Sequence, residues 1–143
     1  KHYVAIVARH ETFYGKGWKN EGIGSNNWGA VQTRNSDPSQ SFKHIDHHAD
    51  GSQYTAIFKK YPDNASGAND LIRILLKPNV KAALAGGNGD DAVASQRSNG
   101  YFEAPLALYH QALRRNYEEF LKKTNEPRLI TFTVGNVTEK KIP

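Results

Sequence analysis

The chain has 143 residues, of which 38% are hydrophobic, and its formal net charge is +5. This length fits one domain with a modest core, and no apolar run reaches the roughly 20 residues that a membrane-spanning helix needs. The absence of cysteine excludes disulfides and cysteine-ligated zinc, while the positive charge favours an anionic partner: nucleic acid, a membrane surface or a wall polymer.

The first predicted element is a helix over residues 2–12. Three apolar residues and one acid recur at i, i+3, i+4 and i+7 along it: Val4, Val7, Ala8 and Glu11. The carboxyl group of Glu11 therefore shares a face with apolar side chains. Partial burial there favours the neutral form, as a general acid near neutral pH requires. The alternative is that Glu11 ends the helix and points into water.

A loop and a β-hairpin are expected next. Residues 15–27 are rich in glycine and asparagine and are too polar and flexible for regular structure. Strands over residues 41–48 and 53–58 flank a turn that contains the favoured Asp-Gly pair. Strand alternation places two sets of side chains on one face each: Phe42, His44, Asp46 and His48, then Tyr54, Ala56 and Phe58.

Helices dominate the remaining sequence. The first begins at Asp63 or Asn64 and runs to about Lys77, where Pro78 stops it. Its buried side is predicted to hold Ala68, Leu71, Ile72, Leu75 and Leu76. Shorter helices are expected over residues 80–85 and from Asp90 to Gly100, with acidic residues at the start of the second.

The longest helix is predicted over residues 105–123, with proline in its first turn. Its core positions are Leu106, Tyr109, Leu113, Tyr117 and Phe120. Residues 128–134 alternate apolar and polar side chains, which predicts a late edge strand or a tail. The sum is a mostly helical α+β fold, with a domain over residues 1–125 and a C-terminal strand or tail over residues 126–143.

Six motifs in order carry a resemblance to a known family. They are the helix-terminal Glu11, Gly15-Lys16-Gly17-Trp18, Asn26-Asn27-Trp28-Gly29-Ala30-Val31-Gln32, Phe58-Lys59-Lys60-Tyr61-Pro62, Gly67-Ala68-Asn69-Asp70-Leu71-Ile72, and Gly100-Tyr101-Phe102 with Tyr109 downstream. Over roughly residues 2–120 the chain resembles the lysozyme-like superfamily, in particular glucosaminidase-type peptidoglycan hydrolases of the flagellar rod-cap and autolysin type.

The resemblance implies a lysozyme-like fold with a cleft and Glu11 as the catalytic acid. It also shows departures. The Gly-Trp segment comes several residues later than usual, the Trp28-Gly29 motif is one residue shorter, and the hairpin acid is Asp46 instead of Glu. Gly29-Ala30-Val31-Gln32 also resembles the Gly-Leu-Met-Gln segment of lytic transglycosylases and goose-type lysozymes, so the bond that is cut stays open.

Glycoside hydrolysis uses a second carboxylate to activate water or to attack the sugar. Three residues compete for this role. Asp46 lies on a hairpin strand that the resemblance places across the cleft from Glu11, Glu21 has the spacing that phage-type lysozymes use, and Asp37 lies between loop and hairpin. In a fourth alternative, the acetamido group of the substrate or a water held by polar groups replaces a protein base.

Aromatic and amide side chains are the candidate substrate-binding residues. Flat aromatic faces suit pyranose rings, and amides hydrogen-bond acetamido groups. The candidates are Asn27, Trp28, Gln32, Tyr61, Tyr101 and Tyr109. The competing interpretations are that Tyr109 packs in the core and that the amides hold the loop together. His44, Asp46 and His48 also read as a zinc-ligand pattern, but no other ligand set is evident, so we expect no metal and no cofactor.

These features predict an endo-acting glycosidase that cuts peptidoglycan glycan strands, the glucosaminidase bond first and the muramidase bond second. The expected location is extracellular, periplasmic or cell-wall associated, with the chain a monomer or a module of a larger protein. The start of the chain has neither the length nor the cleavage site of a signal peptide. Basic residues are scattered without a zinc-finger or RNA-recognition signature, so we expect no nucleic-acid binding and no membrane insertion. The non-enzymatic alternative is a peptidoglycan-binding module.

Overall fold

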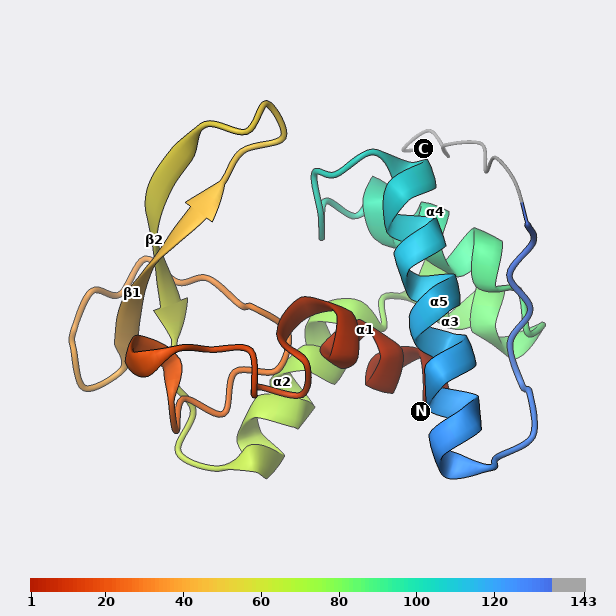
Figure 1. The fold of residues 1–143 in the computed structure, drawn as a ribbon, viewed down its shortest axis with the longest axis horizontal. Helices are drawn as coiled ribbons and strands as arrows, with labels where there is room; N and C mark the ends of the chain where they lie inside the picture. Colours follow the sequence, from red (N-terminus) through yellow and green to blue (C-terminus); the bar gives the residue numbers. More distant parts are fainter. Residues whose placement is uncertain (135–143) are drawn as a thin grey trace. The chain divides into compact units, whose positions relative to one another are not determined.

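A computed structural model of the chain describes residues 1–134, in which it contains five α-helices and one two-stranded antiparallel sheet (Figure 1). About 47% of the residues are helical, so the predicted α+β class is confirmed. The chain divides into two compact units: a hairpin unit, Val7–Arg73, and a helical unit, Lys1–Ile6 with the described residues from Ile74 onward. Residues 135–143, the last part of the predicted 126–143 tail, lie outside the described residues.

Helix α1 (His2–Thr12) has the predicted bounds. Its fully buried side chains cover a wider arc than the predicted stripe: Tyr3, Ile6, Val7 and Ala8. Val4 is half-buried, and so is Glu11 in the last turn of the helix. The carboxyl group of Glu11 is therefore neither fully enclosed nor directed entirely into water.

The loop after α1 contains one turn of 3-10 helix, η1 (Asn20–Gly22), so the expectation of no regular structure over residues 15–27 is wrong at this point. The physical reason is a close approach of Trp18 to Gly22. A Cβ atom at residue 22 would overlap the Trp18 side chain, and glycine leaves the room that the indole occupies. The sequence pattern shows composition but not this tertiary contact.

Strands β1 (Ser41–His47) and β2 (Gln53–Lys59) form the predicted hairpin and pair antiparallel. The register places Phe42 opposite Phe58, His44 opposite Ala56, and Asp46 opposite Tyr54. The predicted shared face is therefore confirmed. Its inner end is a small core of buried Phe42, Ala56 and Phe58, and Trp18 packs against it.

Helix α2 (Asn64–Leu75) begins where predicted, because the Asp63 carboxylate accepts a hydrogen bond from the backbone N–H of Ser66 at 2.7 Å. Leu71 and Leu75 are fully buried, as expected. The prediction for Ile72 is wrong, because its side chain is 41% exposed. A helical stripe narrower than the one predicted leaves this position at its solvent edge.

The helical unit contains α3 (Pro78–Ala85), α4 (Gly89–Ser98) and α5 (Leu106–Thr124), with α4 packed against both of the others (Figure 1). Helix α4 is capped by Asn88, whose side chain accepts from the N–H of Asp91. Helix α5 ends at Asn125, which adopts the left-handed conformation. All three helices lie within a few residues of their predicted bounds.

Buried polar groups of the helical unit are paired with one another. Tyr3 donates a hydrogen bond to Gln96, and Gln96 donates to Tyr109 at 3.2 Å. His110 lies 2.6 Å from Asp90, which also accepts from the N–H of Thr133. Burial opposes ionisation of Asp90, but these hydrogen bonds outweigh it and lower the pKa of the carboxyl group.

The expected strand over residues 128–134 is reduced to a single parallel bridge between Thr131 and Asn88. The alternation itself is present, since Ile130 and Phe132 are buried and Val134 is 85% exposed. Only the Gly87 carbonyl and the Gly89 N–H pair with Thr131, because the chain then enters α4. The segment is an extended tail that pairs with another backbone segment at one residue, and the N–H groups of Leu129, Ile130 and Thr133 donate to the side chains of Tyr117 and Asp90.

Gly67 gives a test of the packing in the hairpin unit. Replacing a glycine by alanine inside a helix ordinarily stabilises it by about 1 kcal/mol. A Cβ atom at residue 67 would overlap the carbonyl oxygen of Asn26, so we expect Gly67→Ala to lower the free energy of unfolding by about 1–3 kcal/mol. Urea denaturation measures the change.

The control is Gly86→Ala, because a Cβ atom there meets only Ala83 at an ordinary 3.7 Å. We expect this variant to unfold within about 0.5 kcal/mol of the original chain. A Gly67→Ala protein as stable as the control would contradict the close approach of α2 to the Asn26 loop.

Candidate functional site

One pocket of the hairpin unit, with a volume of about 420 Å³, is formed by the end of α1, the loop that follows it and the sheet. Glu11 from α1 and Asp46 from β1 both line this pocket. The resemblance placed these carboxyl groups across a cleft from each other, and the structure brings both to one pocket. We take it as the candidate active site.

Glu11 is positioned by the anchoring of its neighbour Thr12. The Thr12 hydroxyl donates to the backbone oxygen of Trp28 at 2.8 Å and accepts from the N–H of Gly15 at 2.7 Å. A second backbone bond joins the N–H of Gly17 to the Thr12 carbonyl at 2.8 Å. The end of α1, which carries Glu11, is thus fixed to the loop that follows it.

Trp18 is the largest aromatic side chain of the pocket lining. Its ring centroid lies 5.0 Å from that of Phe42 and 4.9 Å from that of Phe58, both part of the small sheet core. Its indole N–H donates to the backbone oxygen of Asn27 at 2.8 Å. Trp18 is missing from the substrate-binding residues expected from the sequence; the Gly-Trp motif was the signal that could have placed it there.

Asp46 belongs to a polar cluster on the sheet. Gln32 and Tyr54 each donate a hydrogen bond to its Oδ2 at 3.3 Å, and Gln32 also donates to the Tyr54 hydroxyl at 3.1 Å. The backbone N–H of His47 donates to Oδ1 at 2.8 Å. Two sequence candidates, Asp46 and Gln32, are thus in direct contact. The exposed Gln32 side chain helps to orient the carboxylate, and its role as an acetamido-binding group stays a prediction.

The other acidic candidates lie outside the pocket lining. Glu21 is 53% exposed and faces His44, with 3.6 Å between Oε2 and Nδ1. The Asp37 carboxylate accepts two hydrogen bonds from Ser39, one from its backbone and one from its hydroxyl, and both lower the pKa of Asp37. Asp37 is therefore a turn residue, and Asp46 is the acidic residue that shares the pocket with Glu11.

Two histidines complete the pocket lining: His10 from α1 and His44 from β1. Burial lowers the pKa of His10, so its imidazole is neutral at neutral pH. Within residues 1–134, no three His, Asp or Glu side chains gather in a group that could hold a metal ion. The pattern His44, Asp46 and His48 therefore does not form a ligand set in the described structure.

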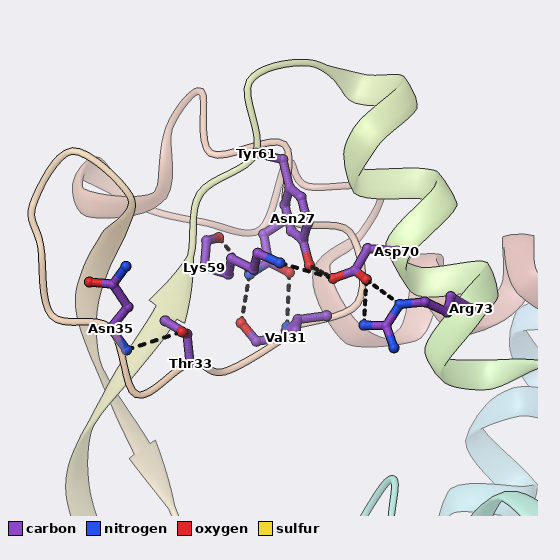
Figure 2. Close-up of polar contacts among 8 residues, drawn as sticks. All are labelled: Asn27, Val31, Thr33, Asn35, Lys59, Tyr61, Asp70 and Arg73. Atoms are coloured by element: carbon purple, nitrogen blue, oxygen red, sulfur yellow. Dashed lines mark hydrogen bonds and ion pairs between the residues drawn. The ribbon is translucent and has the colours of Figure 1, made fainter.

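Asn27 is fully buried, and its amide bonds only to backbone (Figure 2). Its Nδ2 donates to the carbonyls of Val31 and Lys59, and its Oδ1 accepts from the N–H of Val31, all at 2.9 Å. Of the two roles considered for Asn27, the structure supports holding the loop. The side chain has no exposed surface with which to contact a substrate.

Tyr61 and Asp70 form a second cluster, shown in Figure 2. The buried Tyr61 hydroxyl donates to Asp70 Oδ2 at 2.5 Å, and burial together with this bond raises the Tyr61 pKa. Arg73 donates to Asp70 Oδ1 at 2.6 Å, and Lys59 lies 3.5 Å from Oδ2. Burial opposes ionisation of Asp70, but these partners outweigh it and lower its pKa.

The Tyr61 ring borders a second pocket of about 440 Å³, which Lys59, Lys60 and Asn35 also line. Lys60 donates to the carbonyl of Pro38 at 2.9 Å, and Lys59 is directed to Asp70. Trp28 lines neither pocket; its indole N–H donates to Asn64 at 3.3 Å. Tyr61 and Trp28, the aromatic candidates of the hairpin unit, thus each donate a hydrogen bond to another side chain of that unit.

Tyr101 and Tyr109 belong to the helical unit. Tyr109 is 4% exposed and stacks on Phe102 with 3.7 Å between ring centroids. Its hydroxyl accepts the hydrogen bond from Gln96. The core-packing interpretation of Tyr109 is therefore the one that the structure supports, and Tyr101 is half-buried beside this core.

Comparisons with protein-family models, with curated proteins and with solved structures find no match for this chain. None of the helices in residues 1–134 combines the length and apolar composition that crossing a bilayer requires. The candidate active site brings together two carboxyl groups, two imidazoles and the Trp18 side chain around one pocket.

Asp70 allows the stability of the hairpin unit to be tested as a function of pH. Hydrogen bonds to a charged group contribute about 1.5–3 kcal/mol, so Asp70→Asn should lower the free energy of unfolding by that amount at pH 7. Because the folded-state pKa of Asp70 lies below its ordinary 3.8, the stabilisation is present above that value and is lost as the pH falls through the folded pKa.

The measurement is urea denaturation followed by tryptophan fluorescence between pH 7 and pH 2. Both tryptophans, Trp18 and Trp28, lie in the hairpin unit, so the signal reports that unit. The two proteins should converge in stability at the acidic end. A difference that stays constant down to pH 2 would contradict the ionic role of Asp70.

Proposed function

We propose that this chain is an endo-acting glycoside hydrolase of lysozyme-like fold that cleaves the glycan strands of bacterial peptidoglycan. The observation that supports it is the common pocket lined by Glu11 and Asp46. Hydrolysis of a glycosidic bond uses a carboxylic acid to protonate the leaving oxygen and a second carboxylate on the other side of the sugar. Glu11 takes the first role and Asp46 the second.

The environments of the two carboxyl groups differ. Glu11 is half-buried in the last turn of α1, and Arg9 and His10 from the same helix also line the pocket. Asp46 accepts hydrogen bonds from Gln32, Tyr54 and the His47 backbone, which fix the direction of its oxygens. A carboxylate held by hydrogen bonds in the same pocket as the acid is suited to orient water or to attack the anomeric carbon.

The remaining features of the pocket fit a sugar polymer. The Trp18 indole provides an aromatic surface of the kind on which pyranose rings stack, with its polar N–H bonded to the backbone. The net charge of +5 favours an anionic wall polymer. We place the protein outside the cell membrane, in the periplasm or at the cell wall, acting as a monomer or as a module of a larger chain.

The deciding experiment is incubation with purified peptidoglycan, followed by turbidity and by mass spectrometry of borohydride-reduced products. The new reducing end identifies the bond: a reduced glucosamine residue for a glucosaminidase, a reduced muramic acid for a lysozyme, and an anhydro sugar for a lytic transglycosylase. Binding without a change in turbidity would favour the other class, a peptidoglycan-binding module.

Glu11→Gln tests the general acid directly. The substitution keeps the shape of the side chain and removes the transferable proton, so we expect turnover to fall on the order of 10³-fold or more. Glu103→Gln changes the net charge equally at an exposed position of the helical unit and should leave turnover unaltered. A Glu11→Gln protein with a tenth of the original turnover would exclude the assignment.

Asp46→Asn and Glu21→Gln separate the two candidates for the second carboxylate. Because Asp46 lines the pocket and Glu21 does not, Asp46→Asn should reduce kcat by on the order of 10²-fold or more, and Glu21→Gln by less than about threefold. Initial rates of turbidity loss measure both. The reverse order would support the arrangement of phage-type lysozymes, with Glu21 as the catalytic partner.

A further inference from the structure

Phe13 is a strained aromatic residue at the edge of the pocket that contains Glu11. Its backbone φ angle is +50°, in the left-handed region, and its side chain is 44% exposed. Bulky residues rarely adopt this conformation, and when they do the surrounding structure enforces it. Here the enforcing contacts are the bonds from the Phe13 N–H to Arg9 and from the Lys16 N–H to the Phe13 carbonyl.

Arg9 accompanies Phe13 at the pocket. It lies one helical turn earlier, and its guanidinium carbon is 5.4 Å from the centroid of the Phe13 ring. Both side chains line the pocket together with Glu11 and Asp46. Among the lining residues, Arg9 is the one with a permanent positive charge. The pair thus offers an exposed aromatic surface with a fixed cation beside it.

We infer that Arg9 and Phe13 form a subsite that selects a muramic acid unit whose lactyl group carries no stem peptide and therefore ends in a free carboxylate. The apolar face of the pyranose packs on the exposed part of the Phe13 ring. The planar guanidinium of Arg9 forms paired hydrogen bonds with the carboxylate. This inference rests on the proposed function, because it specifies which sugar unit of the glycan lies next to Glu11.

The strain at Phe13 supports a binding role over a packing role. A residue that served the core would gain stability by burying its ring, yet Phe13 leaves nearly half of its side chain exposed in an unfavourable backbone conformation. Tyr14 also has a positive φ, +58°, but it does not line the pocket. The two adjacent residues therefore form a matched pair in which only Phe13 is expected to contact the ligand.

The test uses two probes of equal length: peptide-free glycan strands, which carry free lactyl carboxylates, and neutral chitin oligosaccharides. Affinities are measured by titration calorimetry and by tryptophan fluorescence, to which Trp18 in the pocket contributes. We expect the original protein to bind the anionic glycan more tightly, with an affinity that falls as salt is added, because exposed charge attraction is screened.

Arg9→Gln should weaken binding of the anionic glycan about tenfold, which corresponds to about 1.4 kcal/mol, and leave chitin affinity within about twofold. Arg9→Lys keeps the charge and loses the planar guanidinium. Its affinity for the anionic glycan should lie between that of the original protein and that of Arg9→Gln. Phe13→Ala should weaken both probes. An Arg9→Gln protein that loses affinity equally for both probes, or a Phe13→Ala protein that binds like the original, would overturn the inference.

Phe13→Gly and Tyr14→Gly separate strain from binding. Glycine accepts a positive φ without cost, so each variant should have a higher thermal midpoint than the corresponding alanine variant at the same position. Only Phe13→Gly should lose glycan affinity. If Tyr14→Gly reduces affinity as much as Phe13→Gly, loop geometry and not the Phe13 ring determines binding, and the inference is wrong.

Failure of this inference and failure of the proposed function give different results. Cleavage that depends on Glu11 but not on Arg9 or Phe13 would overturn the subsite and leave the hydrolase. Selective binding that depends on Arg9 and Phe13 without any cleavage would support the subsite in a wall-binding module. No binding of either probe by the original protein would overturn the subsite itself.

Discussion

The hairpin unit depends on the hydrogen bonds that the buried side-chain amide of Asn27 makes. Its side chain bonds both the loop at Val31 and the strand β2 at Lys59, and its backbone oxygen accepts from the indole of Trp18. A fully buried amide that lost these partners would cost about 1–3 kcal/mol for each unsatisfied group. Asn27 therefore joins the loop after α1 to the sheet and holds Trp18, the largest aromatic side chain of the pocket lining.

Thr12 also lines the pocket, and its hydrogen bonds join the end of helix α1 to the loop that follows it. Its hydroxyl contacts the Trp28 carbonyl and the Gly15 N–H, so the helix end is fixed where the chain leaves it. The two residues that follow Thr12, Phe13 and Tyr14, lie in the left-handed region, and the bonds of Phe13 to Arg9 and Lys16 hold the first of them there. The unfavourable conformation persists because the surrounding hydrogen bonds are stronger than the local preference.

Periodicity in the sequence predicted most of the elements because each depends on contacts near in the chain. The bounds of α1, the hairpin formed by β1 and β2, and the cap at Asp63 all follow from local patterns. The choice between the two roles of Asn27 and the exposure of Ile72 did not follow, because they depend on segments distant in sequence. For the same reason, the sequence identified Glu11 and Asp46 as candidates but missed Trp18, which lines the same pocket.

Strand β1 contributes residues both to the small sheet core and to the candidate active site. Alternate residues of β1 face the same way, so Phe42, His44 and Asp46 pass from the buried end of the sheet to its polar end. Phe42 packs with Trp18, His44 lies 5.5 Å from the Trp18 ring, and Asp46 accepts from Gln32 and Tyr54. Packing at one end of the strand fixes the register, because a slip of one residue would expose Phe42. That same register directs the Asp46 carboxylate to the pocket it shares with Glu11, so the stability of the sheet core and the geometry of the site cannot vary independently.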